Sequence, residues 1–143
     1  GATRHELEEQ VTRSDLDESV LFFGKTDAKG VRALLSYADL SVMPGVEAFS
    51  RAILESMSCG TPVVGLNKGG TVEYVGRFER EVGLSTPLLY DGTPQNLASV
   101  IRATLSANLK RSHSSQLRSW TSANFEMVAR AKEKVDFIER SLS

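Results

Sequence analysis

The stretch VEAFSRAILESMSCGTPVVG, residues 46–65, predicts a helix followed directly by a buried strand. Ser50 has the kind of side chain that caps helix N-termini, and the apolar side chains after it recur at helical spacing. Gly60 suits the left-handed conformation in which helices end, and the apolar run of residues 62–66 follows it. The stretch therefore indicates one helix-to-strand unit of an α/β fold.

The same alternation continues on both sides of this unit. Strands are predicted at residues 19–24, 40–44 and 62–66 and, interrupted by Pro87, at residues 82–90. Helices are predicted at residues 3–13 and 30–40, from Ser50, at residues 69–76, and from Pro94 onward. Strands that alternate with helices favour a Rossmann-like parallel sheet with flanking helices, and 143 residues suffice for one such domain.

Composition argues against several classes of protein. A net charge of −1 argues against a nucleic-acid binder, and no apolar run in the sequence is long enough for a membrane span. Cys59 is the single cysteine, so no disulfide can form within the chain and the cytoplasm is the expected compartment. Residues 101–143 carry a balance of +4, which indicates either a solvated helical face or a peripheral membrane contact.

The opening stretch also carries candidate chemistry. Glu47 precedes the predicted helix and Glu55 lies within it, at a strand-to-helix turn where parallel sheets bind ligands. The first amides of such a helix lack partners and can bind a phosphate, while carboxylates accept hydrogen bonds from sugar hydroxyls. A diphosphate at the helix start, with one sugar at each carboxylate, suits a nucleotide sugar.

The sequence PGVEAFSRAILESMSCGTPVVGLNKGGTVEYV, residues 44–75, resembles the E-x7-E signature of retaining GT-B-fold glycosyltransferases of the glycogen-synthase-like group. Residues 20–44 and 86–106 are similar to the segments that flank that signature. The resemblance implies the C-terminal, donor-binding half of a GT-B fold. It also implies retaining transfer of a sugar from a UDP-, GDP- or ADP-sugar to a sugar, lipid or other hydroxyl acceptor, with no further cofactor and no bound metal.

Carried over position by position, the resemblance assigns roles to single residues. Glu55 would bind the ribose, and Glu47 would lie beside the transferred sugar as the catalytic residue. The other donor-binding positions are the turn residues Phe49, Ser50 and Arg51, the pair Gly69 and Gly70 with Glu73 behind it, and the loop residues Gly24 and Lys25.

The resemblance implies absences as well. The start of the chain resembles the turn after the second strand of the family's C-terminal domain, so two strands, their basic clamp and the acceptor-binding N-terminal domain are expected to be missing. The strand at residues 19–24 would then pair with residues 40–44, with another chain, or with nothing, and the isolated fragment is expected either to repack or to self-associate through unpaired strands. Trp120, Phe125 and Phe137 are expected to face the missing part, without which the fragment should be inactive.

Two other functions stay open at this point. One is a nucleotide-sugar epimerase of the same fold, which would change its substrate without an acceptor. The other is a non-catalytic binding or assembly module, which would bind the missing half but no nucleotide.

Overall fold

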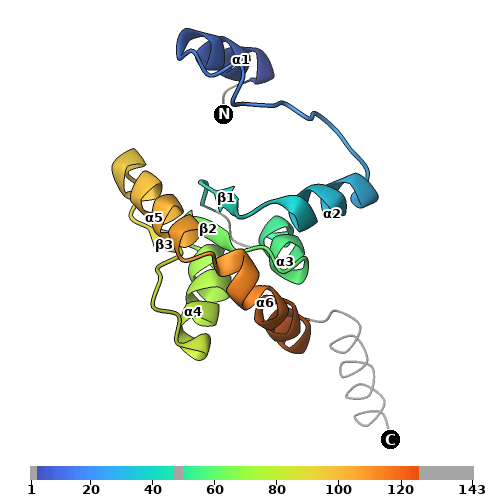
Figure 1. Cartoon of the computed structure of the whole chain (residues 1–143), viewed down its shortest axis with the longest axis vertical. Coiled ribbons are helices and arrows are strands. Elements are labelled where there is room, and N and C mark those ends of the chain that lie inside the picture. Colours follow the sequence, from blue (N-terminus) through green and yellow to red (C-terminus); the bar gives the residue numbers. More distant parts are fainter. Residues whose placement is uncertain (1–2, 47–49, 126–143) are drawn as a thin grey trace, which may run out of the picture.

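The computed structural model describes residues 3–46 and 50–125. In chain order its elements are α1 (Arg4–Arg13), α2 (Ala28–Tyr37), β1 (Ser41–Met43), α3 (Arg51–Ser58), β2 (Val63–Leu66), the π-helical turn η1 (Val72–Gly76), α4 (Arg77–Val82), β3 (Leu89–Tyr90), α5 (Pro94–Ser106) and α6 (Leu109–Phe125) (Figure 1). The three strands form one parallel sheet in the order β1-β2-β3. This arrangement confirms the predicted α/β class with helices flanking a parallel sheet.

Local signals set the ends of α3 as predicted. The Oγ of Ser50 accepts a hydrogen bond from the backbone N–H of Ile53 at 3.4 Å, which satisfies one of the orphan amides of the first turn. At the other end Gly60 has a φ of +73°, the left-handed conformation that turns the chain toward β2. The helix-to-strand unit is therefore defined by residues within it.

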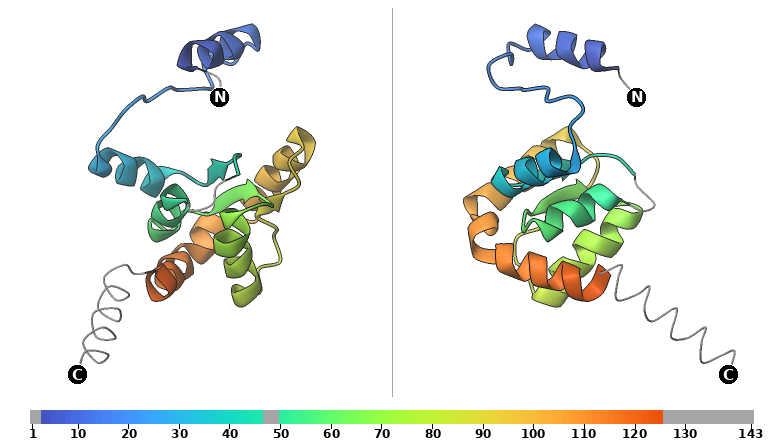
Figure 2. Two further views of the ribbon diagram at one scale, coloured as in Figure 1. Left: turned by 180° about the vertical axis from the view of Figure 1, so that it is seen from behind. Right: turned by 90° about the vertical axis from the view of Figure 1, so that its right-hand side faces the viewer.

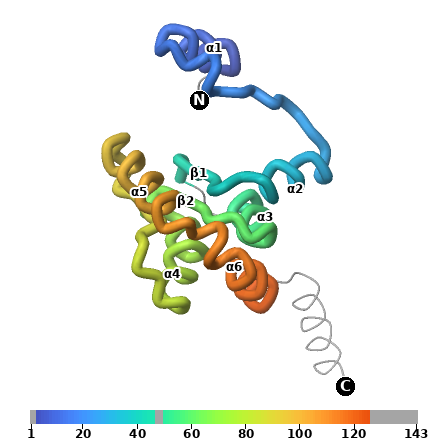
Figure 3. Tube along the Cα trace, in the orientation of Figure 1, coloured from blue at the N-terminus to red at the C-terminus, as the bar shows by residue number. Residues whose placement is uncertain are grey.

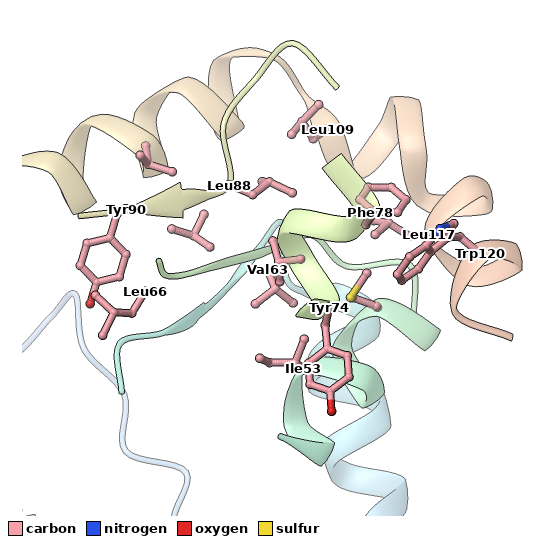
Figure 4. Packing of buried hydrophobic residues seen from close by; sticks show 14 residues of the cluster. Ile53, Val63, Leu66, Tyr74, Phe78, Leu88, Tyr90, Leu109, Leu117 and Trp120 are labelled. Atoms are coloured by element: carbon pink, nitrogen blue, oxygen red, sulfur yellow. The ribbon is translucent and has the colours of Figure 1, made fainter. Parts of the chain in front are cut away.

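The hydrophobic core lies around β2, whose four residues are all buried. The helices α3 and η1 pack on β2 and on each other, while α5 packs on β2 and β3. Within the described residues fourteen buried apolar side chains form the core (Figure 4), namely Ile53, Met57, Val63, Val64, Leu66, Tyr74, Val75, Phe78, Leu88, Tyr90, Val100, Leu109, Leu117 and Trp120. All of them follow the start of α3, and from the part of the chain before it the partly buried Leu40 and Met43 pack against this core.

Trp120 and Phe125 face this core, and the prediction that they face a missing partner was wrong. The ring of Trp120 meets Phe78 edge-on with 5.4 Å between centroids, and its Nε1 donates a hydrogen bond to Glu81 at 2.7 Å. Phe125 packs edge-on against Tyr74 at 5.2 Å. These contacts lie within one folded chain, which sequence spacing alone does not reveal. The third residue of that prediction, Phe137, lies outside the described residues.

The strand predicted at residues 19–24 does not form. This segment runs as irregular chain from α1 toward α2, and α1 stands apart from the rest of the molecule (Figures 2 and 3). Leu21 is 74% and Phe23 62% exposed. A strand needs a hydrogen-bonding neighbour, and in the described part of the chain β1 pairs only with β2. Of the three outcomes considered for this segment, pairing with residues 40–44 is therefore wrong, and pairing with another chain stays a prediction.

The strand predicted at residues 82–90 is also shorter than expected. Val82 is the last residue of α4, and Gly83 ends that helix with a φ of +69°. Only Leu89 and Tyr90, after Pro87, pair with β2. The apolar residues on either side of the turn belong to two elements, which explains why the run looks like one interrupted strand.

Candidate functional site

The strands β1, β2 and β3 are parallel, so their carboxyl ends share one edge of the sheet, where ligands bind in open α/β folds. The chain leaves β1 at Pro44 and enters α3 after Ser50. It leaves β2 through residues 67–69 and enters the next helix at Gly70. Glu47 and Phe49 lie outside the described residues, so their assigned roles stay predictions.

Arg51 and Glu55 lie one turn apart on α3. The Nη2 of Arg51 is 3.7 Å from the Oε1 of Glu55. Their side chains are 82% and 48% exposed, and an exposed pair of this spacing contributes only about 0.3–0.5 kcal/mol. Either side chain can therefore turn to a ligand at little cost to the fold.

Glu55 lies on the wall of a groove between α2 and α3, two helices that pack side by side (Figure 1). The groove has a volume of about 460 Å³ and is lined by Ala28, Val31, Arg32 and Leu35 from α2 and by Glu55, Ser58 and Cys59 from α3. Apolar side chains form one part of the lining and Glu55, Arg32 and Ser58 supply polar groups. Volume and lining are in the range of small-ligand sites.

A second hollow, of about 490 Å³, is lined by Glu79, Arg80, Gly83, Leu84, Ser85 and Pro87. It lies at the loop that leads into β3, which is the amino end of that strand. Burial raises the pKa of Glu79, but its carboxylate already accepts a hydrogen bond from the backbone of Leu88. This hollow is therefore at the wrong end of the sheet, and its acidic residue is used by the fold.

The helix α6 fixes the two walls of the α2–α3 groove relative to each other. Lys110 donates to the carbonyl of Leu35 in the last turn of α2, at 3.5 Å, and to the hydroxyl of Thr61. Arg118 donates to the carbonyl of Cys59 at the end of α3, at 3.2 Å. Burial lowers the pKa of Lys110 below its ordinary value. Two cations of one helix thus stabilise the carboxyl ends of both groove helices.

The glycine pair after β2 is held close to the sheet. A Cβ added to Gly65 would lie 2.3 Å from the Cγ2 of Thr71, so the helix that starts at Gly70 can approach β2 only because residue 65 is glycine. Gly69 has a φ of +60°, and the loop emerges at the carboxyl end of β2, beside that of β1. Thr71 is fully buried, and its hydroxyl has no hydrogen-bond partner within the described residues.

Comparison with known proteins identifies the family. Residues 1–118 match the family described as "Glycosyl transferases group 1". The chain belongs to this glycosyltransferase family. It is 38% identical over 61 residues to the N-acetyl-alpha-D-glucosaminyl L-malate synthase of Bacillus anthracis, and the aligned segment covers 42% of this chain and 16% of that protein. It is 34% identical over 77 residues to the 2-deoxystreptamine N-acetyl-D-glucosaminyltransferase of Streptomyces fradiae, and the aligned segment covers 53% of this chain and 18% of that protein.

This glycosyltransferase chain is similar in structure to sucrose-phosphate synthase from Thermosynechococcus elongatus. The superposition covers the whole of this chain and 36% of the synthase chain. The TM-score is 0.79 and the sequence identity is 28%. This likeness confirms that the fold is a fragment of the GT-B type. The aligned part spans less than a fifth of either curated relative.

The structure brings together some of the residues assigned to the glycosyltransferase donor site and separates others. Ser50, Arg51 and Glu55 share the first two turns of α3, and Gly69 and Gly70 lie at the same edge of the sheet. Glu73 is exposed on η1. The link residues Gly24 and Lys25, between α1 and α2, are absent from the lining of the groove, so their contact with a donor stays a prediction.

None of the site residues predicted from the sequence lies on α2. Ala28, Val31, Arg32 and Leu35 nevertheless form one wall of the groove. Their spacing predicts an amphipathic helix, but it does not predict that the helix lies beside Glu55.

Within residues 3–46 and 50–125 no group of three acidic, histidine or cysteine side chains could hold a metal ion. None of the helices described here is long and apolar enough to cross a membrane.

Proposed function

We propose that this chain binds the nucleoside diphosphate of a donor sugar for retaining transfer of that sugar to a hydroxyl acceptor, with the nucleoside in the α2–α3 groove. The position of Glu55 carries this proposal. Its carboxylate is half-exposed on the wall of the groove, one turn after the start of α3, and could accept hydrogen bonds from two adjacent ribose hydroxyls. The apolar side chains of Val31 and Leu35 offer a surface to the face of a base.

The diphosphate would lie at the start of α3 and at the Gly69–Gly70 loop. The first amides of a helix carry partial positive charge and have no partners within it, so they bind anions. Four residues separate Arg51 from Glu55, a rise of about 6 Å along the helix. That length can join a ribose at Glu55 to a diphosphate at the helix start.

Catalysis would come mainly from stabilising the departing diphosphate electrostatically, with Glu47 beside the transferred sugar. The chain spans a small part of its relatives, and we propose that the acceptor is held by polypeptide outside it. On this account the fragment alone is inactive. The whole enzyme would act in the cytoplasm and transfer the sugar to a sugar, a lipid or another hydroxyl compound. Its basic segment, residues 101–143, would be either a solvated helical face or a peripheral membrane contact.

The names of both curated relatives contain an N-acetylglucosaminyl group. A nucleotide-activated N-acetylglucosamine is therefore the first donor to test. The base is decided by comparing UDP, GDP and ADP.

Calorimetric titration with these three nucleotides tests the proposal. One of them should bind saturably, and Glu55→Ala should weaken that binding at least tenfold, while Glu55→Gln, which keeps one carbonyl oxygen, should weaken it less. Glu8→Ala is the matched control, because Glu8 pairs with Arg4 at the same i,i+4 spacing on α1. The 2′-deoxy nucleotide should lose affinity for the wild type but not for Glu55→Ala. If Glu55→Ala bound the ribonucleotide as the wild type does, the proposed ribose site would be wrong.

A non-catalytic assembly module is the second candidate, and one observation favours it. Among residues 3–46 and 50–125 nine large hydrophobic residues are exposed, and eight of them lie before Glu47. Exposed apolar side chains gathered in one part of the sequence suit contact with other polypeptide. Binding of a GT-B partner half by this chain, with no nucleotide bound by the chain or by the complex, would support this second function against the first.

A further inference from the structure

We infer that the side chains of Arg51 and Lys68 supply the positive charge that holds the donor diphosphate and make the site selective for nucleoside diphosphates over nucleosides. This inference rests on the proposed function and deepens it. It concerns two side chains, whereas the roles assigned above to the helix start and to the glycine loop concern backbone amides.

The loops at the carboxyl edge of the sheet contain few cations. Within the described residues, the segments that leave β1, β2 and β3 and enter the following helices carry basic side chains only at Arg51 and Lys68. The segment after β3 carries Asp91 and no cation. A diphosphate bound across the ends of β1 and β2 would therefore meet one cation from each of two neighbouring strands.

Neither cation is needed by the fold. Arg51 is 82% exposed and, among the residues that the structure describes, makes only the long contact to Glu55. Lys68 is exposed, and in the part of the chain that the structure describes its ammonium makes no ion pair. Other cations are engaged: Arg77 with Glu81 at 2.6 Å, and Lys110 and Arg118 with helix carbonyls.

The local charge favours such cations. The carboxylate of Glu55 is near the proposed phosphate position and would repel a diphosphate that is not neutralised. A guanidinium can donate two parallel hydrogen bonds to a phosphate, which are stronger than its present 3.7 Å contact with Glu55. When Arg51 turns to the phosphate, Glu55 becomes available to the ribose. One exchange of partners would thus prepare both contacts.

The variants Arg51→Gln and Lys68→Gln test this inference, with Arg111→Gln as the control because Arg111 is an exposed arginine on α6, outside these loops. Each nucleoside diphosphate is titrated beside its nucleoside, and inorganic pyrophosphate is used as a competitor. We expect each test variant to weaken diphosphate binding about tenfold, which is about 1.4 kcal/mol, and not to weaken nucleoside binding. The salt dependence of diphosphate binding should fall in both variants but not in the control.

The two proposals fail in different ways. If the wild type binds no nucleotide, the proposed function is wrong and this inference falls with it. If the wild type prefers a diphosphate to its nucleoside, and both test variants keep the full preference and salt dependence, only this inference is wrong. Loss of pyrophosphate competition in the double variant, with nucleoside binding intact, would confirm it.

Discussion

Gly65→Ala should disturb the packing of β2 against Thr71 through one identifiable contact. The added Cβ would lie 2.3 Å from the Cγ2 methyl of Thr71, more than 1 Å inside the usual separation of about 3.5–4.0 Å between carbons. Its next neighbours, the Cβ of Thr71 and the carbonyl of Met43, are at ordinary distances of 3.6 and 3.8 Å. One methyl group therefore accounts for the whole clash.

The expected cost follows from the surroundings of that methyl. Thr71 is fully buried, so its side chain cannot turn away, and overpacking costs about 1–3 kcal/mol, here near the upper end because the overlap exceeds 1 Å. Alanine is favoured over glycine within a strand by about 0.5–1 kcal/mol, which offsets part of the cost. We expect a net loss of about 2 kcal/mol for Gly65→Ala. Thr71→Ser, which deletes the methyl, should cost about 1 kcal/mol by itself.

Chemical denaturation of the four proteins of this double-mutant cycle measures the coupling. Independent effects would make the double variant about 3 kcal/mol less stable than the wild type. The contact instead predicts a loss of about 1 kcal/mol or less, since the new methyl of Ala fills the space that Thr71→Ser leaves. Nucleotide affinity should fall in Gly65→Ala, because the loop at Gly69 is displaced, and return in the double variant. Additive losses would refute the reasoning.

Three further predictions concern stability and association. Burial raises the pKa of Glu79, so folding favours the protonated carboxyl group. The resulting contribution to the free energy of unfolding is fully present below the ordinary pKa of 4.5 and is lost as pH rises through the raised pKa. Glu79→Gln should therefore gain stability relative to the wild type across that window, and a difference independent of pH would contradict this. Trp120→Phe loses the hydrogen bond to Glu81 and should cost about 2 kcal/mol in urea denaturation; a loss under about 0.5 kcal/mol would show that the bond contributes little. Sedimentation should show that the wild type self-associates and that Phe23→Lys abolishes the association. The matched control Leu105→Lys, at a residue that is 49% exposed, should still associate. A monomeric wild type would exclude self-association.

The features that could be predicted from the sequence are those that a few neighbouring residues determine. The cap at Ser50 and the stop at Gly60 each act within one turn, and both ends of α3 form as expected. The glycosyltransferase family was likewise evident because many signature positions recur in order. Glu55 could be placed on α3 for the same local reason.

The features that could not be predicted depend on contacts distant in the sequence. Residues 19–24 have the composition of a strand, but a strand also needs a neighbour, which no described strand supplies. The burial of Trp120 depends on Phe78 and Glu81, about forty positions away in the chain. The groove depends on the packing of α2 on α3, so its lining from Ala28 onward has no sequence signal beyond helical spacing.

Backbone amide NMR of the isotope-labelled chain, titrated with UDP, GDP and ADP, tests the central claim most directly. Binding of one nucleotide in the α2–α3 groove predicts shifts that saturate together at the lining of both helices, at Glu55 and at the Gly69–Gly70 loop, while α1 and α4 stay unchanged. These shifts should disappear in Glu55→Ala, which should remain folded. No saturable shifts with any of the three nucleotides, or shifts confined to residues outside this edge of the sheet, would contradict the claim that this chain holds the donor nucleotide.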